Sequence, residues 1–181
     1  MTRIAIVDPQ PAVRAGLTIL LRSEPGLIPV GSAAGAEDGL ELVERLRPSV
    51  VLLDGDDLRL SRRLKALPHP PRVIVYTSED DALMARVAGA DGLVDKTAEP
   101  AELFDAIRVV ARGGSALPPL DRAELDEAAH RIDPEDLALL AMLVDGTPAG
   151  DVADTLHLDR RRIGRRIERM LGRLRRTPAA A

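Results

Sequence analysis

Short apolar runs alternate with amphipathic helical segments through the first 112 residues, and this alternation constrains the fold more than any other feature. Continuous apolar strands separated by helices are typical of a parallel sheet covered on both faces. We therefore predict an α/β domain with a five-stranded parallel sheet, and Pro29 indicates that the second strand lies at an edge. The apolar runs are residues 4–7, 28–30, 50–53, 73–76 and 92–94, and leucines and valines recur at helical spacing within 13–21, 40–46, 60–67, 82–87 and 103–110.

Polar side chains follow four of the five predicted strands. They are Asp8, Asp54, Thr77 and Lys96. In an open parallel sheet the functional groups gather at the carboxyl ends of the strands, so we expect these four side chains to converge. Two carboxylates, a hydroxyl and an ammonium at one rim form a candidate site for a phosphoryl group.

The C-terminal third of the chain separates acidic from basic residues. Residues 121–158 contain ten acids and two arginines, a net charge of −8, whereas residues 159–181 contain nine arginines and two acids, a net charge of +7. The total charge of −4 conceals this separation. A helix with one concentrated positive face attracts a phosphate backbone, so the last segment is a candidate for nucleic-acid binding. The alternative is a solvated helix whose charge only maintains solubility.

Three short helices are predicted in the same region. Asp133-Pro134-Glu135 is typical of a helix start with Asp133 as the N-cap, and Asp145-Gly146 ends the helix that follows. A second helix buries Val152, Ala153 and Leu156. Asp159 is expected to cap a third helix, in which apolar residues form one stripe and arginines the other faces. Three short helices with a basic third one indicate a helix-turn-helix.

Composition excludes several classes of function. With no cysteine, the chain forms no disulfide and no cysteine zinc site. Tyr76 and Phe104 are its only aromatic residues, too few for binding single strands by base stacking. No apolar run approaches the roughly 18 residues of a membrane span, and no signal peptide is evident. We therefore expect a cytoplasmic protein. Since no Ser/His/Asp set has coherent spacing, we also expect that it is not an enzyme.

The first domain resembles the receiver domain of bacterial response regulators. The matching segments are IAIVD (4–8), VVLLD (50–54), VIVYTS (73–78) and LVDK (93–96). The resemblance implies that Asp54 is the phosphoacceptor, that Thr77 and Lys96 contact the phosphoryl oxygens, and that Asp8 is a ligand for Mg²⁺.

The receiver pattern is broken at three places. Receivers usually have two adjacent acids after the first strand, whereas here Pro9 follows Asp8 and offers no side-chain oxygen. The loop after Asp54 reads Gly-Asp-Asp-Leu, and Leu93 stands where the family has a switch aromatic. Whether the domain binds Mg²⁺ is therefore left undecided, with Asp8 and Asp54 as the candidate ligands. Asp56 or Asp57 could replace the missing acid. We predict a degenerate receiver that is not conventionally phosphorylated.

Residues 132–174 are similar to the LuxR-type DNA-binding domain, and a receiver followed by this domain is the architecture of NarL/FixJ-type response regulators. The match rests on the Gly146 turn and the pattern of Val152-Ala153, Leu156 and Leu158. The third helix of such domains enters the major groove. The resemblance gives Gly164, Arg165 and Glu168 as base-facing residues. The expected phosphate contacts are Arg160, Arg161, Arg162, Arg166 and Arg169.

These observations predict a receiver-like domain at 1–113, a linker with a helix at 114–131, and a helix-turn-helix domain at 132–176. The expected function is transcription regulation in a two-component system by binding double-stranded DNA. The family usually adds a fourth helix for dimerisation, which the sequence lacks, so a homodimer would form through the receiver or the linker helix. A histidine kinase or a small ligand is the expected input. The alternative is a signalling module whose receiver binds a protein or small ligand and whose basic helix is masked or does not bind DNA.

Overall fold

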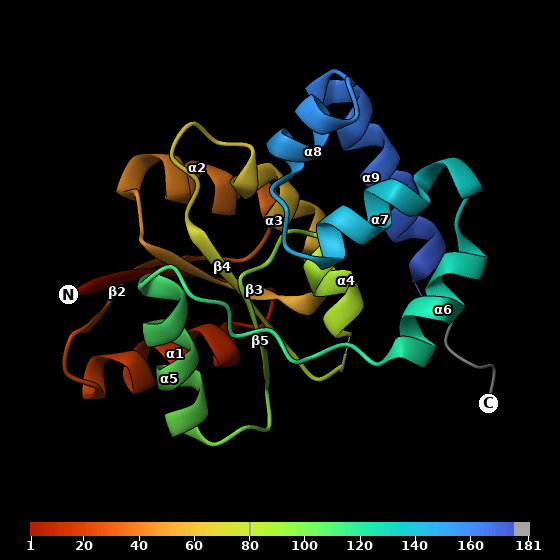
Figure 1. Cartoon of the computed structure of the whole chain (residues 1–181). Helices are drawn as coiled ribbons and strands as arrows, with labels where there is room; N and C mark the ends of the chain where they lie inside the picture. Colours follow the sequence, from red (N-terminus) through yellow and green to blue (C-terminus); the bar gives the residue numbers. More distant parts are fainter. Residues whose placement is uncertain (80, 176–181) are drawn as a thin grey trace. The chain divides into compact units, whose positions relative to one another are not determined.

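A computed structural model describes residues 1–79 and 81–175, and by its internal contacts the chain divides into two compact units. The sheet unit consists of residues 1–80 and 90–118, and the helical unit of residues 81–89 and 119–181. The predicted α/β and all-α architectures are both present (Figure 1). Arg176, the last residue of the predicted helix-turn-helix domain, lies outside the described residues.

The sheet unit contains five parallel strands in the order β2-β1-β3-β4-β5. The strands are β1 (Thr2–Val7), β2 (Leu27–Ala33), β3 (Val50–Asp54), β4 (Arg72–Thr77) and β5 (Gly92–Asp95). Pro29 lies in the edge strand β2, as its missing N–H predicts. The register between β1 and β2 shifts immediately after Pro29, because Ile4 pairs with Pro29 and Ala5 with Gly31.

Helices cover both faces of this sheet. They are α1 (Pro11–Ser23), α2 (Ala36–Leu46), a 3-10 turn (Gly55–Asp57), α3 (Leu58–Lys65) and α5 (Pro100–Ala111). Figure 1 shows α1 and α5 on one face of the sheet and α2 and α3 on the other. The alternation of side chains along β1 explains the two layers, since Ile4 and Ile6 pack under α1 and α5 whereas Ala5 and Val7 pack under α2 and α3.

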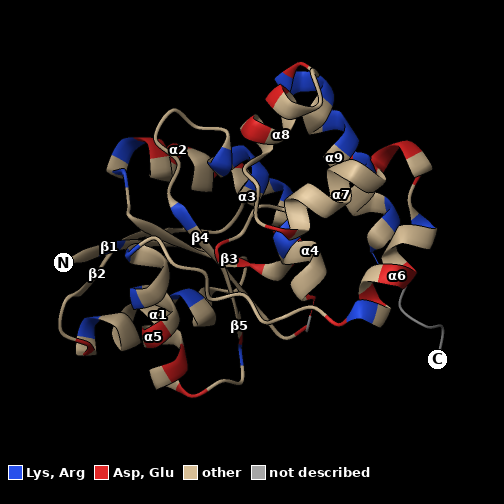
Figure 2. Ribbon diagram, in the orientation of Figure 1, with Lys and Arg blue, Asp and Glu red and all other residues tan. Residues whose placement is uncertain are grey.

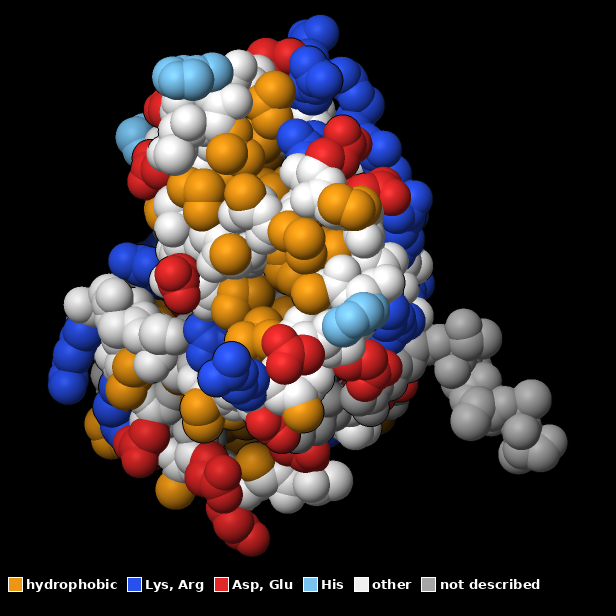
Figure 3. All heavy atoms as spheres, turned by 45° about the vertical axis from the view of Figure 1, so that its right-hand side comes forward, with side chains coloured by type: hydrophobic (Ala, Val, Ile, Leu, Met, Phe, Trp, Pro, Cys, Tyr) orange, Lys and Arg blue, Asp and Glu red, His pale blue; other side chains and the backbone are white. Residues whose placement is uncertain are grey.

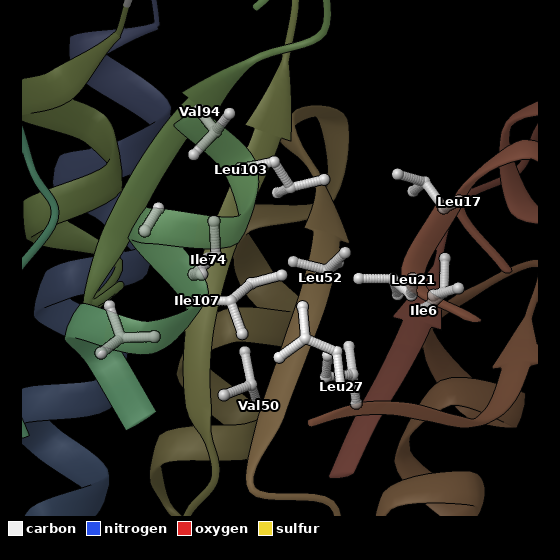
Figure 4. Close-up of a cluster of buried hydrophobic side chains, with 13 residues drawn as sticks. Ile6, Leu17, Leu21, Leu27, Val50, Leu52, Ile74, Val94, Leu103 and Ile107 are labelled. Atoms are coloured by element: carbon white, nitrogen blue, oxygen red, sulfur yellow. The ribbon is translucent and has the colours of Figure 1, made fainter. Parts of the chain in front are cut away.

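The core beneath α1 and α5 is aliphatic (Figure 4). Ile107 of α5 and Leu21 of α1 are fully buried against Leu52 and Ile74 of the central strands. At about 25 cal/mol per Å² of buried apolar surface, each such side chain contributes roughly 1.5–3 kcal/mol. This packing fixes the strands whose carboxyl ends carry the polar residues.

Beyond α5 the chain turns back onto the sheet. Gly113 adopts a left-handed conformation with φ of 91°, which glycine tolerates without strain. The amide of Ala116 then donates to the carbonyl of Asp91 at 2.8 Å, and the amide of Leu93 donates to the carbonyl of Ala116 at 3.1 Å. Ala116 thereby forms an isolated parallel bridge with Gly92 at the outer edge of β5.

The helical unit is built from α4 (Ala82–Val87), α6 (Arg122–Arg131), a 3-10 turn (Pro134–Asp136), α7 (Leu137–Val144), α8 (Ala149–Thr155) and α9 (Arg160–Leu174). Gly146, with φ of 84°, turns the chain between α7 and α8. As predicted, the carboxylate of Asp159 accepts from the amide of Arg162 and caps α9. The apolar stripe of α9 is buried at Ile163, Ile167, Met170, Leu171 and Leu174. No helix within the described ranges is long and apolar enough to cross a membrane.

Candidate functional site

The carboxyl ends of β1, β3 and β5 bring three of the four expected residues into direct contact. Asp8 and Asp54 are buried, with 2% and 7% of their surface exposed. The ammonium of Lys96, at the end of β5, donates to Asp8 Oδ2 at 2.8 Å and also to Asp54 Oδ1. Because Asp54 pairs in register with Tyr76, Thr77 lies one residue further along β4. We call Asp8, Asp54 and Lys96 the receiver pocket.

Each carboxylate oxygen of the receiver pocket accepts a hydrogen bond. Asp8 Oδ1 accepts from the amide of Gln10 at 2.7 Å and Oδ2 from Lys96. Asp54 Oδ2 accepts from the amide of Asp56 at 3.2 Å and Oδ1 from Lys96. Mg²⁺ requires near-octahedral oxygen ligands at about 2.0–2.1 Å, whereas here an ammonium lies between the two acids. The residues of the pocket therefore do not fit a magnesium site.

The two acids that follow Asp54 make local hydrogen bonds. Asp57 Oδ1 accepts from the amide of Leu60 at 3.2 Å and caps α3. Asp56 is exposed, and its backbone is turned toward Asp54 through the amide. Among residues 1–79 and 81–175, the only group of three potential metal-ligating side chains lies elsewhere, at Asp133, Glu135 and Asp136.

Thr77 faces the loop after Asp54. A Cβ atom on Gly55 would collide with the Thr77 side chain, so glycine permits this close approach. The Thr77 hydroxyl oxygen accepts from the amide of Glu79 at 3.1 Å. Thr77 is thus next to the receiver pocket, as the strand order predicts, and its hydroxyl caps the turn that follows β4.

The environment of Lys96 keeps it charged. Burial lowers the pKa of Lys96, but its hydrogen bonds to Asp54 and Asp8 and the negative charges of these two acids together raise it by more, so the pKa of this ammonium lies above its usual value. Tyr76 lies beside it, with the ammonium 5.9 Å from the ring centroid. Burial raises the pKa of the Tyr76 phenol, and the nearby charge of Lys96 opposes that shift.

Sequence reasoning missed Arg14. Its guanidinium donates to the carbonyls of Asp8 at 2.7 Å and Pro9 at 3.0 Å, which holds the loop after β1 in place. Its partners are backbone oxygens, which leave no trace in the residue pattern. The only available signal was its position in the first turns of the helix that follows Asp8.

The second candidate site is the basic face of α9, where Figure 2 shows lysines and arginines in blue. In Figure 3 basic side chains follow one another along the right-hand side of the view. Glu168 is exposed beside these arginines and Gly164 is partly buried. Among the residues expected to contact DNA, the exposed arginines are Arg160, Arg161, Arg162, Arg165 and Arg169.

Arg166 does not lie on this exposed face. Its Nε donates to Asp136 Oδ1 at 2.5 Å, and its Nη2 donates to the carbonyl of Glu135. Only 13% of the Arg166 side chain and 3% of the Asp136 side chain are exposed. The expectation that Arg166 contacts phosphate therefore conflicts with its position, because the guanidinium already neutralises a buried carboxylate.

Asp133 also differs from its expected role. It precedes the 3-10 turn but its side chain makes no capping hydrogen bond. Its carboxylate instead pairs with Arg173 at 2.5 Å. The helix start was predicted correctly in position, and the capping role of Asp133 was wrong.

The chain combines a five-stranded α/β unit that carries the receiver pocket with a helical unit that carries the basic helix α9. This combination defines a two-part signalling protein. Residues 4–108 match the model of the response regulator receiver domain. The chain therefore belongs to the response regulator family.

Relatives extend the similarity beyond the receiver. The DNA-binding transcriptional activator DevR/DosR of Mycobacterium tuberculosis is 32% identical over 99% of this chain and 93% of its own length. Response regulator RamR of Streptomyces coelicolor is 34% identical over 88% of this chain and 83% of its own length. The crystal structure of a LuxR-family two-component response regulator from Aurantimonas sp. SI85-9A1 covers 66% of this chain and 91% of its own, with 31% identity and a TM-score of 0.60.

Proposed function

We propose that this chain is a DNA-binding transcriptional regulator of response-regulator type whose receiver is not conventionally phosphorylated. The observation that carries the DNA-binding part is α9, a fifteen-residue helix whose apolar stripe is buried and whose other faces expose six arginines, five of them among the residues expected to contact DNA. A rigid helix of this kind fits the major groove of a duplex. DevR/DosR, named as a DNA-binding transcriptional activator, is similar to this chain over nearly its full length.

Within α9, Gly164, Arg165 and Glu168 are the proposed base-facing residues. Arg165 matches the bidentate pairing of arginine with guanine, and Glu168 can accept from the amino group of cytosine. The proposed phosphate contacts are Arg160, Arg161, Arg162 and Arg169. Each phosphate contact releases a counterion, so binding is expected to weaken steeply with salt.

Fluorescence anisotropy with the full chain tests this proposal. Four phosphate contacts give a slope of about −3.6 in log K against log salt, so affinity for a random-sequence duplex should fall about 150-fold between roughly 50 and 200 mM salt. Replacing Arg160, Arg161 and Arg162 by glutamine should remove most of that dependence. Exposed Arg59 of the sheet unit provides the matched control, and R59Q should bind as the wild type does. No duplex binding at the lower salt concentration would refute DNA recognition and favour an interaction module.

The receiver proposal rests on the occupied carboxylates of the receiver pocket. Phosphoryl transfer to Asp54 requires that the developing charge be stabilised by a metal and by fixed donors. Lys96 supplies one such donor, but Asp8 Oδ2 and Asp54 Oδ1 already share its ammonium and Pro9 supplies no side-chain oxygen. We infer that the pocket serves as a structural centre in which two carboxylates share one ammonium.

Intact-mass measurement after incubation with acetyl phosphate and Mg²⁺ tests the receiver proposal. We expect no adduct with the mass of one phosphoryl group. A typical receiver carrying both acids after its first strand is the positive control. An adduct on the wild-type chain that disappears in D54A would refute the proposal.

We further propose that the chain acts in the cytoplasm without enzymatic activity, and that a sensor kinase or a small ligand supplies its input. A homodimer would form through the receiver or α6. Light scattering of the full chain, with and without duplex, measures its oligomeric state, and a monomer on DNA would refute the dimer.

A further inference from the structure

Three arginine side chains hold α9 to one short segment of the helical unit. This segment is residues 131–136, which we call the brace segment. Arg166 pairs with Asp136, and Arg173 pairs with Asp133. Arg131 donates to the carbonyls of Arg173 at 3.0 Å and Arg175 at 2.9 Å, near the end of α9. The brace segment therefore contacts α9 in its middle, in its last turn and at its C-terminal carbonyls.

The two arginines project from the same flank of the helix. Arg166 and Arg173 are seven residues apart, close to two full turns, so their side chains lie almost one above the other. This flank borders the buried stripe of Ile163, Ile167 and Met170. Ion pairs on one edge of that stripe oppose rotation of α9 about its axis. Apolar contacts fix this rotation less specifically, because the hydrophobic effect is non-directional.

The two pairs differ in strength. Arg166 and Asp136 are 13% and 3% exposed, so solvent screens this pair little. Moving Arg166 to a phosphate would leave Asp136 as an unpaired buried carboxylate, which is strongly unfavourable. Arg173 and Asp133 are 44% and 35% exposed, and pairs at such exposure contribute little to stability. The Arg166–Asp136 pair is the main contact.

We propose that Asp136 and Arg166 are positioning residues for DNA recognition. By fixing the rotation of α9 on the brace segment, they keep Arg165 and Glu168 directed at the base edges. The acids at 133 and 136 are then bound by guanidinium groups, which explains their proximity without a metal ion. This inference rests on the proposed DNA-binding function and assigns sequence discrimination to two residues that do not touch DNA.

Equilibrium binding of the full chain to two probes tests the proposal. The probes are a duplex selected by the wild type from a random pool and a random-sequence duplex. Discrimination is the ratio of the two dissociation constants. In R166Q we expect this ratio to fall about tenfold, the scale of one lost base contact, while the salt slope on random duplex is unchanged. In R169Q the slope should fall by about 0.9, as for one phosphate contact.

Replacing Asp136 distinguishes a positioning role from a simple effect of charge on DNA binding. Removing a negative charge near DNA should tighten binding to any duplex. D136N should instead lose discrimination as R166Q does, because α9 is no longer fixed. Glu135 is the matched control, since E135Q removes an exposed neighbouring charge and keeps the carbonyl that Arg166 contacts. E135Q should retain the wild-type ratio.

A measurement on the wild type covers variants that fail to fold. The NMR signal of the Arg166 Nε–Hε group should stay unmoved when random duplex is added, whereas that of Arg169 should shift. A shift of Arg166 equal to that of Arg169, a salt slope reduced by about 0.9 in R166Q, or unchanged discrimination in D136N each overturns the positioning role. If the wild type binds neither probe, the proposed function fails and this inference fails with it.

Discussion

Replacing Lys96 by methionine should destabilise the sheet unit more than any surface substitution. Lys96 is the cation shared by Asp8 and Asp54, and its side chain is only 16% exposed. Methionine keeps much of the side-chain volume but removes the charge. Both carboxylates would then be buried without a cation, and breaking a buried pair from one side costs about 3–5 kcal/mol. We expect a loss of about 4 kcal/mol in the free energy of unfolding.

Urea unfolding followed by tyrosine fluorescence measures this loss. Tyr76 is the only tyrosine and the chain has no tryptophan, so the emission reports on the sheet unit alone. With a slope of about 2 kcal/mol/M, the midpoint should fall by about 2 M. R59M, which removes an exposed cation of α3, should change stability by less than about 0.5 kcal/mol.

A double variant identifies the cause of the destabilisation. K96M/D8N removes one of the two uncompensated charges, so it should be more stable than K96M. A loss below about 1 kcal/mol in K96M, the range of an exposed ion pair, would show that the two acids do not depend on Lys96. The same result would remove the basis for a structural role of the receiver pocket.

Three further expectations follow from single positions. Because the pKa of Lys96 is raised on folding, the stability difference between wild type and K96M should be constant from neutral pH to about 10 and should shrink only above the usual lysine value of about 10.4, as urea midpoints at each pH will measure. Arg47 ends α2 with φ of 45°, so R47G should be about 1 kcal/mol more stable than R47A, in which the left-handed strain persists; equal midpoints would contradict this. Ile107 is fully buried, and I107A should cost about 2–5 kcal/mol, whereas a loss below that range would mean that the core collapses around the cavity.

The sheet and the receiver pocket could be predicted because each strand, together with the polar residue at its end, is recognised from a local sequence pattern. Buried parallel strands are continuously apolar, and the carboxyl ends of parallel strands meet at one rim. Asp8, Asp54 and Lys96 therefore came together as the topology requires. Their pairing in detail could not be predicted, since the sequence does not show that Lys96 reaches both acids.

The ion pair of Arg166 could not be predicted, for a different physical reason. Its charge alone made it resemble the other arginines of α9, whereas its role depends on Asp136, thirty residues earlier. Only the packing of one helix on another decides that the two side chains meet. Asp133 shows the same limit. A carboxylate before a proline is typical of a helix cap, but here it pairs with Arg173 of another helix, which the local sequence does not show.

The bridge between Ala116 and Gly92 affects how copies of this chain can associate. Open strand edges present unpaired amides and carbonyls on which another chain can polymerise. On β5 the segment around Ala116 occupies part of that edge, and on β2 Pro29 removes a hydrogen-bond donor. With both margins of the sheet obstructed, fibril-like growth by strand addition is suppressed, and helix surfaces are left as the routes to self-assembly.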